Sequence, residues 1–228
     1  MISNMLYILI IILLSCSLPE SKNMDLLNHK IDFTCPGNIG CDCEKQNDCF
    51  NGNCFKIPKG GFCMPSEGDY FPDFFSLNQF EELISINNIK TKGKYVLLEM
   101  GTTWCAPCNV LASWLTWDDN EIQNKRWWKP EYKQIKELIN NNEVIFITIL
   151  YEDENRNNAT YDTVYEWYDN YPDKHTIVLS DNNKELHKLF KPTGIPAISL
   201  LDSNMKFISY TNRGLNVAFD KLIDLTND

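Results

Sequence analysis

The sequence predicts an α/β fold with a mixed central sheet, preceded by a small disulfide-rich module. From residue 69 onward, short apolar runs alternate with segments of helical periodicity and end in a predicted hairpin. Six cysteines are concentrated in residues 35–63, where few side chains could form a core. Two further cysteines, Cys105 and Cys108, are separated by two residues and lie between a predicted strand and a predicted helix.

The elements of the larger domain, residues 69–228, follow in regular order. Apolar residues at helical spacing, with Ser76 as a candidate N-cap, predict a helix over 74–89. A buried strand is predicted at 95–100, and a helix at 109–115 follows the cysteine pair. The remaining predictions are helices at 131–140, 160–168, 184–190 and 217–225, and strands at 144–149, 176–179, 197–201 and 206–210.

Residues 104–108 read Trp-Cys-Ala-Pro-Cys, a pattern suited to thiol-disulfide exchange. If Cys105 precedes a helix and Cys108 lies one turn later, their sulfurs can form a reducible disulfide. The helix dipole then favours the Cys105 thiolate, which is the form that attacks a disulfide. An inert disulfide or half of a zinc site are the alternatives, and the setting between a strand and a helix favours the redox interpretation.

With this motif, residues 69–228 resemble thioredoxin-fold proteins, and more closely the exported, membrane-anchored TlpA type. The resemblance implies a thioredoxin-like three-layer fold. It also matches Thr193-Gly-Ile-Pro-Ala197: by the resemblance Pro196 is a cis-proline facing the cysteine pair, and Ile195 offers backbone hydrogen bonds to an extended substrate. The residues alone are equally consistent with an ordinary trans proline at the start of a strand.

Glu99 is a third match, because it stands six residues before Cys105, where thioredoxin has a buried aspartate that exchanges protons with the second cysteine. A carboxyl group buried on a strand has a raised pKa and could act as general base for Cys108. The alternative is that Glu99 points to solvent, and the apolar residues around it leave no polar face that would decide.

Residues 116–130 are extra length relative to the thioredoxin pattern, and tryptophan gathers around them. Trp117, Trp127 and Trp128 lie within this insertion and Trp114 just before it, so four of the six tryptophans are clustered. These rings could pack the insertion onto the core, or they could form an aromatic groove beside Cys105 that selects a substrate. Trp104 is expected to shield the site and contact the substrate.

Composition limits the classes of function. A length of 228 residues with 43% hydrophobic residues suits one or two globular domains. The net charge of −10 and the absence of a basic patch argue against a nucleic-acid partner.

Residues 1–16 are predicted to be a lipoprotein-type signal peptide. The apolar stretch at 5–14 is too short to span a membrane comfortably, and Leu13-Leu-Ser-Cys16 resembles the bacterial lipobox. The resemblance implies that Cys16 is lipidated and anchors an exported protein to a bacterial membrane, facing the periplasm or cell surface. The first four residues carry no lysine or arginine, which departs from the pattern, and a plain signal peptide is the alternative. Residues 17–34 are predicted to be a polar tether.

Residues 35–65 are predicted to form a small cysteine-rich module stapled by three disulfides. Fifteen pairings are possible, and only a bond between Cys41 and Cys43 is disfavoured, because a single residue separates them. Zinc held by thiolates is the alternative, but an oxidising compartment favours disulfides. The six residues are Cys35, Cys41, Cys43, Cys49, Cys54 and Cys63.

We therefore expect an exported thiol-disulfide oxidoreductase that acts on protein thiols or disulfides. Cys105 would be the nucleophile and Cys108 the resolving cysteine; the resemblance implies no cofactor beyond this pair, no metal, and a separate redox partner that resets it. Ala106-Pro107 is similar to the Gly-Pro of thioredoxin and favours a reductant over an oxidant. Two rival classes remain: a binding module with an idle disulfide, and a copper or zinc handler, although copper-delivering relatives usually space their cysteines by three residues and add a histidine.

Overall fold

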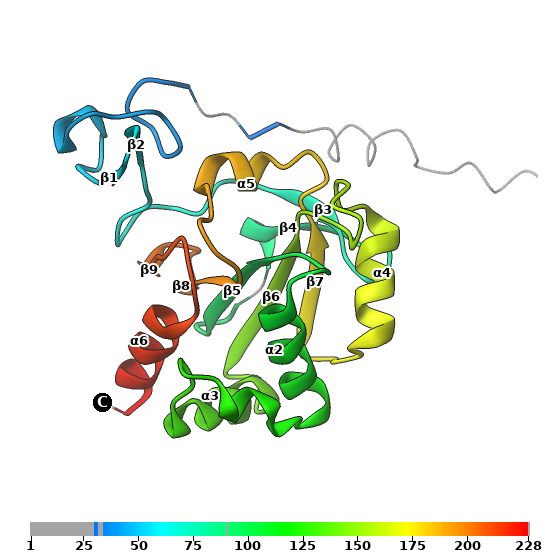
Figure 1. Cartoon of the computed structure of the whole chain (residues 1–228). Coiled ribbons are helices and arrows are strands. Elements are labelled where there is room, and N and C mark those ends of the chain that lie inside the picture. The colour runs from blue at the N-terminus through cyan, green and yellow to red at the C-terminus, as the bar shows by residue number, and fades with distance from the viewer. Residues whose placement is uncertain (1–29, 32–33, 90, 228) are drawn as a thin grey trace, which may run out of the picture.

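A five-stranded mixed sheet is the centre of the computed structural model, which describes residues 30–31, 34–89 and 91–227 (Figure 1). The strand order is β7-β6-β5-β8-β9. The first three strands in that order are parallel, whereas β8 is antiparallel to β5 and β9 is antiparallel to β8. The strands are β5 (Tyr95–Gly101), β6 (Val144–Leu150), β7 (Thr176–Ser180), β8 (Ala197–Leu201) and β9 (Phe207–Ser209).

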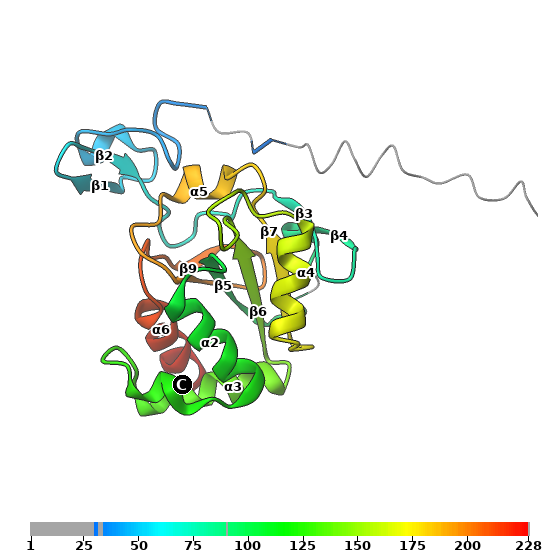
Figure 2. The ribbon, with the colours of Figure 1, turned by 45° about the vertical axis from the view of Figure 1, so that its right-hand side comes forward.

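Alternation along β5 separates two cores. Val96, Leu98 and Met100 pack in one cluster with residues of α5, while Leu97 packs in another with residues of α2, α3 and α6. Helices therefore lie on both faces of the sheet, which gives the predicted thioredoxin-like three-layer fold (Figures 1 and 2). The helices are α2 (Ala106–Trp117), α3 (Lys133–Asn140), α4 (Tyr161–Asn170), α5 (Glu185–Phe190) and α6 (Asn216–Asn227).

The helix predicted over 74–89 is wrong, because this segment forms a hairpin of β3 (Phe75–Leu77) and β4 (Leu83–Ser85), followed by the short 3₁₀ helix η2 (Ile86–Asn88). The turn explains the error. The Asn78 side-chain oxygen accepts hydrogen bonds from the backbone N–H groups of Phe80 and Glu82, both at 2.9 Å. Glu81 has φ of 60°, a left-handed conformation that an α-helix does not contain.

The hairpin covers the outer edge of β7, which explains why a helical pattern is overridden. The amide side chain of Gln79 accepts from the Val178 N–H at 3.0 Å and donates to the Thr176 carbonyl at 2.9 Å. Ser76, predicted to be an N-cap, instead accepts from the Ser180 N–H at 3.1 Å. Side chains thus satisfy backbone groups that an edge strand would leave unpaired.

The other predicted helices and strands are present, with ends that differ by a few residues. The prediction for 131–140 divides into the 3₁₀ turn η4 (Pro130–Tyr132) and α3. The extra length at 116–130 contains the 3₁₀ helix η3 (Asn120–Asn124).

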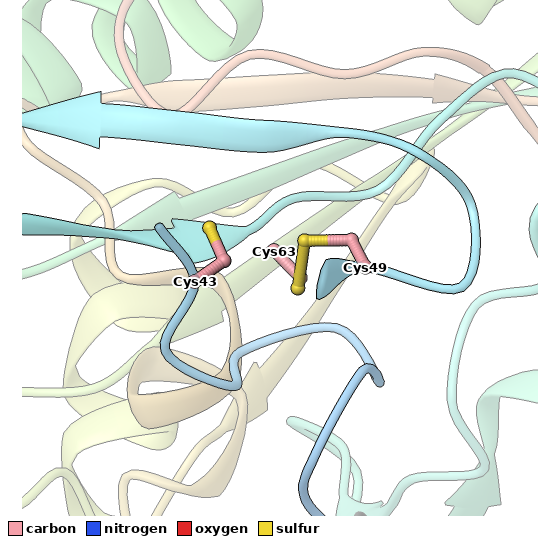
Figure 3. A group of neighbouring side chains, drawn as sticks. All are labelled: Cys43, Cys49 and Cys63. Atoms are coloured by element: carbon pink, nitrogen blue, oxygen red, sulfur yellow. A yellow bond between two sulfur atoms is a disulfide. The ribbon is translucent and has the colours of Figure 1, made fainter. Parts of the chain in front are cut away.

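The cysteine-rich region consists of η1 (Gln46–Asp48) and a hairpin of β1 (Cys54–Ile57) and β2 (Gly60–Cys63). Figure 3 shows the sulfur of Cys43 beside the Cys49–Cys63 disulfide, and these three sulfurs lie within 4.8 Å of one another. Each sulfur is bonded in a disulfide, so it is not a thiolate available to zinc. Cys41 and Cys43 do not pair with each other, as predicted; the bonds are Cys35–Cys41, Cys43–Cys54 and Cys49–Cys63.

This region packs against α5 and the chain that follows it. A Cβ at Gly40 would lie 2.9 Å from the Leu189 carbonyl oxygen, so only a glycine permits this approach. The Lys191 ammonium lies 5.1 Å from the centre of the Phe62 ring and 3.4 Å from an Asp42 carboxylate oxygen. The contacts place the region next to the segment that leads into β8.

The predicted signal peptide, Cys16 and nearly all of the predicted tether lie outside the described residues. Within the segment expected to be a tether, Ile31 is buried in the core cluster that contains α5 residues, and its N–H donates to the Glu185 carboxylate at 2.7 Å. No helix in the described part of the chain is long and apolar enough to cross a membrane.

Candidate active site

The cysteine pair lies where β5 ends and α2 begins. Cys105 is the N-cap of α2, and its sulfur accepts a hydrogen bond from the Cys108 N–H at 3.2 Å. Pro107 occupies the first turn of the helix, where a missing N–H costs nothing. The two sulfurs form a disulfide, with their Cα atoms 5.2 Å apart. The structure therefore gives the pair the helix-terminal position that thiol-disulfide exchange requires.

Both cysteines are buried in this oxidised form. Cys105 is 2% exposed and Cys108 is 1% exposed. Trp104 and Ile195 are partly buried and pack against the cluster that contains the two cysteines. The structure therefore leaves little of either cysteine open to solvent in the oxidised form.

Trp104 is held by charged groups that sequence reasoning missed. Its indole N–H donates to Glu152 at 2.9 Å, and Glu152 also forms an ion pair with Lys184 at 2.7 Å. Burial alone would raise the pKa of Glu152, but the hydrogen bonds from Lys184 and Trp104 lower it overall. The Arg156 guanidinium stacks over the Trp104 ring, 4.1 Å from its centre. These residues lie far along the chain from Trp104, and no local pattern could have identified them.

Glu99 lies inside the protein, beneath the pair. The side chain is 2% exposed, and one carboxylate oxygen accepts from the Thr148 hydroxyl at 3.0 Å. The other oxygen has no hydrogen-bond partner among the described residues. Burial raises the pKa of Glu99 to about 7, and the Thr148 hydrogen bond opposes this only in part. Of the two predicted orientations, the structure has the buried one.

Gly101 separates Glu99 from the second cysteine and was also missed by sequence reasoning. A Cβ at this position would lie 3.3 Å from the Cys108 sulfur and 3.4 Å from the unpaired oxygen of Glu99. The missing side chain therefore leaves space between the carboxyl group and the sulfur. A cavity of about 10 Å³, near the smallest size that can hold one water, also borders Glu99 and Thr148.

The Ile195–Pro196 peptide bond is cis, as the resemblance implied. Register explains its position, because Ala197 pairs with Met100 in the antiparallel β8–β5 ladder. The proline thus reaches the same edge of the sheet as the cysteine pair. The backbone N–H and carbonyl of Ile195 make no hydrogen bond to the described part of the chain.

A cavity of about 430 Å³ adjoins this loop and the cysteine pair. Pro107, from between the two cysteines, and Pro196 form part of its wall. Trp127, from the insertion, and Arg213 form another part. The Asn216 side chain donates a hydrogen bond to the Trp127 backbone carbonyl at 2.7 Å. This bond holds the backbone of Trp127 beside the cavity.

The four clustered tryptophans were expected either to pack the insertion onto the core or to form an aromatic groove beside Cys105, and they do not all do the same. Trp114 is buried and meets Trp128 edge to face, with ring centres 4.9 Å apart, so these two pack the insertion onto the core. Trp127 packs against the same core and also lines the cavity beside the cysteine pair. Trp117 is 59% exposed and does neither.

In comparisons with known proteins, no family model matches the chain, and no curated protein sequence matches it. Solved structures do. A thioredoxin-like protein from Bacteroides caccae aligns with a TM-score of 0.51 at 15% identity over 71% of this chain and 50% of its own. A conserved protein of unknown function from Bacteroides fragilis aligns with a TM-score of 0.50 at 16% identity, over 71% of this chain and 98% of its own. A thiol:disulfide interchange protein from Bacteroides sp. aligns with a TM-score of 0.48 at 16% identity, over 72% of this chain and 92% of its own.

These likenesses concern the fold. This chain spans half the length of the Bacteroides caccae protein. At such identity the Bacteroides caccae structure shows that the chain has a thioredoxin-like fold, in agreement with the sheet order and with the helices on both of its faces.

Proposed function

We propose that this protein is a thiol-disulfide oxidoreductase that acts on protein disulfides through Cys105 and Cys108. The observation that carries the proposal is the disulfide at the start of α2, with a buried, unpaired carboxyl oxygen beneath Cys108 and a cis-proline loop beside it. A disulfide with a purely structural role does not need a proton acceptor of pKa about 7 close to one of its sulfurs.

In the reducing direction, the reaction has two exchange steps. The Cys105 thiolate attacks a substrate disulfide, a mixed disulfide forms, and the first substrate sulfur leaves as a thiolate that takes up a proton. The Cys108 thiolate then attacks the Cys105 sulfur. The second substrate sulfur leaves, and the Cys105–Cys108 disulfide forms, so two electrons have passed to the substrate.

Glu99 serves the second step. Cys108 must lose a proton before it attacks, and the nearby carboxylate can accept it across the space that Gly101 leaves. Because the pKa of Glu99 is about 7, the group both accepts and returns a proton near neutral pH. Ile195 would align an extended substrate through its free backbone groups, and Trp104 would cover the cysteine pair.

We assign the reducing direction on the basis of Ala106-Pro107 between the cysteines, which is similar to the thioredoxin pair and carries no histidine to stabilise the thiolate. A separate dithiol protein would restore the reduced form after each turnover.

We further propose that the protein is exported and held at a membrane by lipid on Cys16. The apolar leader and its Leu-Leu-Ser-Cys end support this, and so do three disulfides in the cysteine-rich region, since such bonds persist in oxidising compartments. A Cys16→Ser variant should move from the membrane fraction to the soluble fraction; an unchanged distribution would contradict the anchor.

A second candidate function is a binding module whose disulfide is idle, and the 2% exposure of Cys105 favours it. In that case a Cys105→Ser variant would support the same cellular function as the native protein.

The Cys108→Ser variant tests the oxidoreductase proposal directly. Without the resolving cysteine, reduced Cys105 should attack a protein disulfide and remain joined to it, so mass spectrometry should find the adduct at Cys105. The Cys105→Ser variant is the matched control and should form none. No adduct in the Cys108→Ser variant, with reduced Cys105 verified by alkylation, would leave the binding module as the better account.

A further inference from the structure

Arginine is rare in this chain, and two of its arginines lie near the cysteine pair. The sequence contains only three arginines, Arg126, Arg156 and Arg213, in a protein of net charge −10. The first directly precedes Trp127 in the insertion, the second stacks on Trp104, and the third lines the 430 Å³ cavity. Two separate loops therefore bring arginine to the site, one through Trp104 and one through the cavity.

The two cations that flank the pair have no acidic partner of their own. Among the described residues, neither Arg156 nor Arg213 forms an ion pair. The carboxylate close to Arg156 belongs to Glu152, which is already bound by Lys184 and by the Trp104 N–H. Both guanidinium groups therefore remain free to bind a carboxylate from outside the protein.

Glycine permits the position of Arg213. A Cβ at Gly194 would lie 2.8 Å from the Arg213 Cγ and 3.1 Å from its Nε, so the arginine lies directly across the residue before Ile195. The guanidinium is thereby kept beside the backbone that would align a substrate. Trp127 provides the apolar part of the same cavity, which suits the hydrocarbon stem of an acidic side chain.

We infer that the substrates are protein segments that carry acidic side chains next to the reactive cysteine, recognised by Arg213 and Arg156. This substrate class rests on the proposed oxidoreductase function. An acidic segment approaching a protein of net charge −10 is repelled at long range, so unpaired cations beside Cys105 are needed for it to bind. Basic segments, which the net charge would attract, are the competing class.

The test uses the full chain with reduced Cys105 and Cys108, and three symmetric peptide disulfides as probes. In each peptide the single cysteine is flanked by glutamates, by glutamines or by lysines. Each reaction converts one peptide disulfide into two thiols and the enzyme dithiol into the Cys105–Cys108 disulfide, so thiol release gives the second-order rate constant. Measurements are repeated at ~0.02 M and ~0.5 M salt.

We expect the glutamate probe to react about tenfold faster than the lysine probe at low salt, and the difference to shrink at high salt. Arg213→Gln should reduce the ratio of the glutamate-probe rate to the lysine-probe rate about threefold. The double variant with Arg213→Gln and Arg156→Gln should have a still smaller ratio. Lys188→Gln, which removes an exposed cation of α5, is the matched control and should leave the preference unchanged.

Two results would overturn the inference while leaving the oxidoreductase intact. One is equal rates for the three probes with no effect of Arg213→Gln beyond that of Lys188→Gln, and the other is a faster reaction of the lysine probe. If none of the three probes reacts, the neutral glutamine probe included, the proposed function itself is wrong and the substrate class fails with it.

Discussion

The cysteine-rich region and the α/β domain use disulfides in opposite ways. Around β1 and β2, the core is largely sulfur: Cys43, Cys49, Cys54 and Cys63 form the buried cluster. In the domain, aliphatic and aromatic side chains fill the two main cores on either side of the sheet, and the Cys105–Cys108 bond lies at their margin. One set of bonds replaces a hydrophobic core, whereas the other belongs to a domain that is stable through packing.

This difference would allow the Cys105–Cys108 disulfide to open and close in the proposed exchange reaction. Opening Cys105–Cys108 leaves the strand ladders and the helix contacts in place, since none of them passes through the two sulfurs. Opening Cys49–Cys63 would free a loop whose ends are 14 residues apart in sequence, in a region with few other buried groups.

Cys105→Ser should abolish reduction of a protein disulfide, because no other thiolate can make the first attack. Thermal unfolding of the domain should remain close to that of the reduced native chain, because a serine fits at an N-cap. Thiol release from a disulfide-bonded protein measures the first effect, and circular dichroism measures the second. Residual exchange in this variant would show that another cysteine is reactive.

Replacing both Cys49 and Cys63 with alanine should give the reverse result. The free energy of unfolding of the cysteine-rich region should fall by about 3 kcal/mol, the value expected for a loop of this length. Exchange by Cys105 should persist. Hydrogen exchange resolved along the chain would detect the loss of protection around β1 and β2; a matching loss in β5 and β6 would show that the two regions do not behave separately.

Glu99→Gln should slow resolution of the mixed disulfide about a hundredfold near pH 8, because Cys108 loses its proton acceptor. The native rate should rise with pH around pH 7, the pKa of the carboxyl group, and the variant should lack this rise. Rapid-quench measurement of the mixed disulfide checks both. A variant that keeps the native pH profile would remove Glu99 from the mechanism.

The same substitution should affect stability with a definite sign. The pKa of Glu99 is raised from 4.5 to about 7, so between these values the folded protein holds a proton that the unfolded chain releases. The free energy of unfolding should therefore decrease as pH rises through this window. Glu99→Gln should remove that contribution and make the protein more stable than the native chain above pH 7. Urea denaturation at several pH values measures the difference.

Gln79→Ala should have the smallest effect, a loss of about 1 kcal/mol. The two hydrogen bonds to the covered edge of β7 disappear, and water that enters the space left by the shortened side chain can replace them in part. Gln123→Ala is the matched control and should leave the urea midpoint unchanged, because this half-buried side chain of η3 bonds to Asn120 and not to the sheet. Equal midpoints for both variants would show that the hairpin does not stabilise the sheet.

The sequence was sufficient where structure depends on neighbouring residues. The residues from Tyr95 to Met100 predict a buried strand, and the cysteine pair is predicted to lie at the start of a helix. The structure has both features. The hairpin at 75–85 was missed because its stability comes from bonds between Gln79 and β7, about a hundred residues away. The same limit applies to the site: Arg213 and Trp127 reach the cysteine pair only through the fold.

The most direct test is the reduction of each disulfide in the whole chain. The oxidised protein is equilibrated with dithiothreitol and glutathione buffers of graded potential, free thiols are alkylated, and mass spectrometry assigns each cysteine. Cys105–Cys108 should open at about −250 mV, with Cys35–Cys41, Cys43–Cys54 and Cys49–Cys63 resisting to below about −300 mV. If Cys105–Cys108 opens last, or only when the domain unfolds, the bond is structural and the oxidoreductase account is wrong.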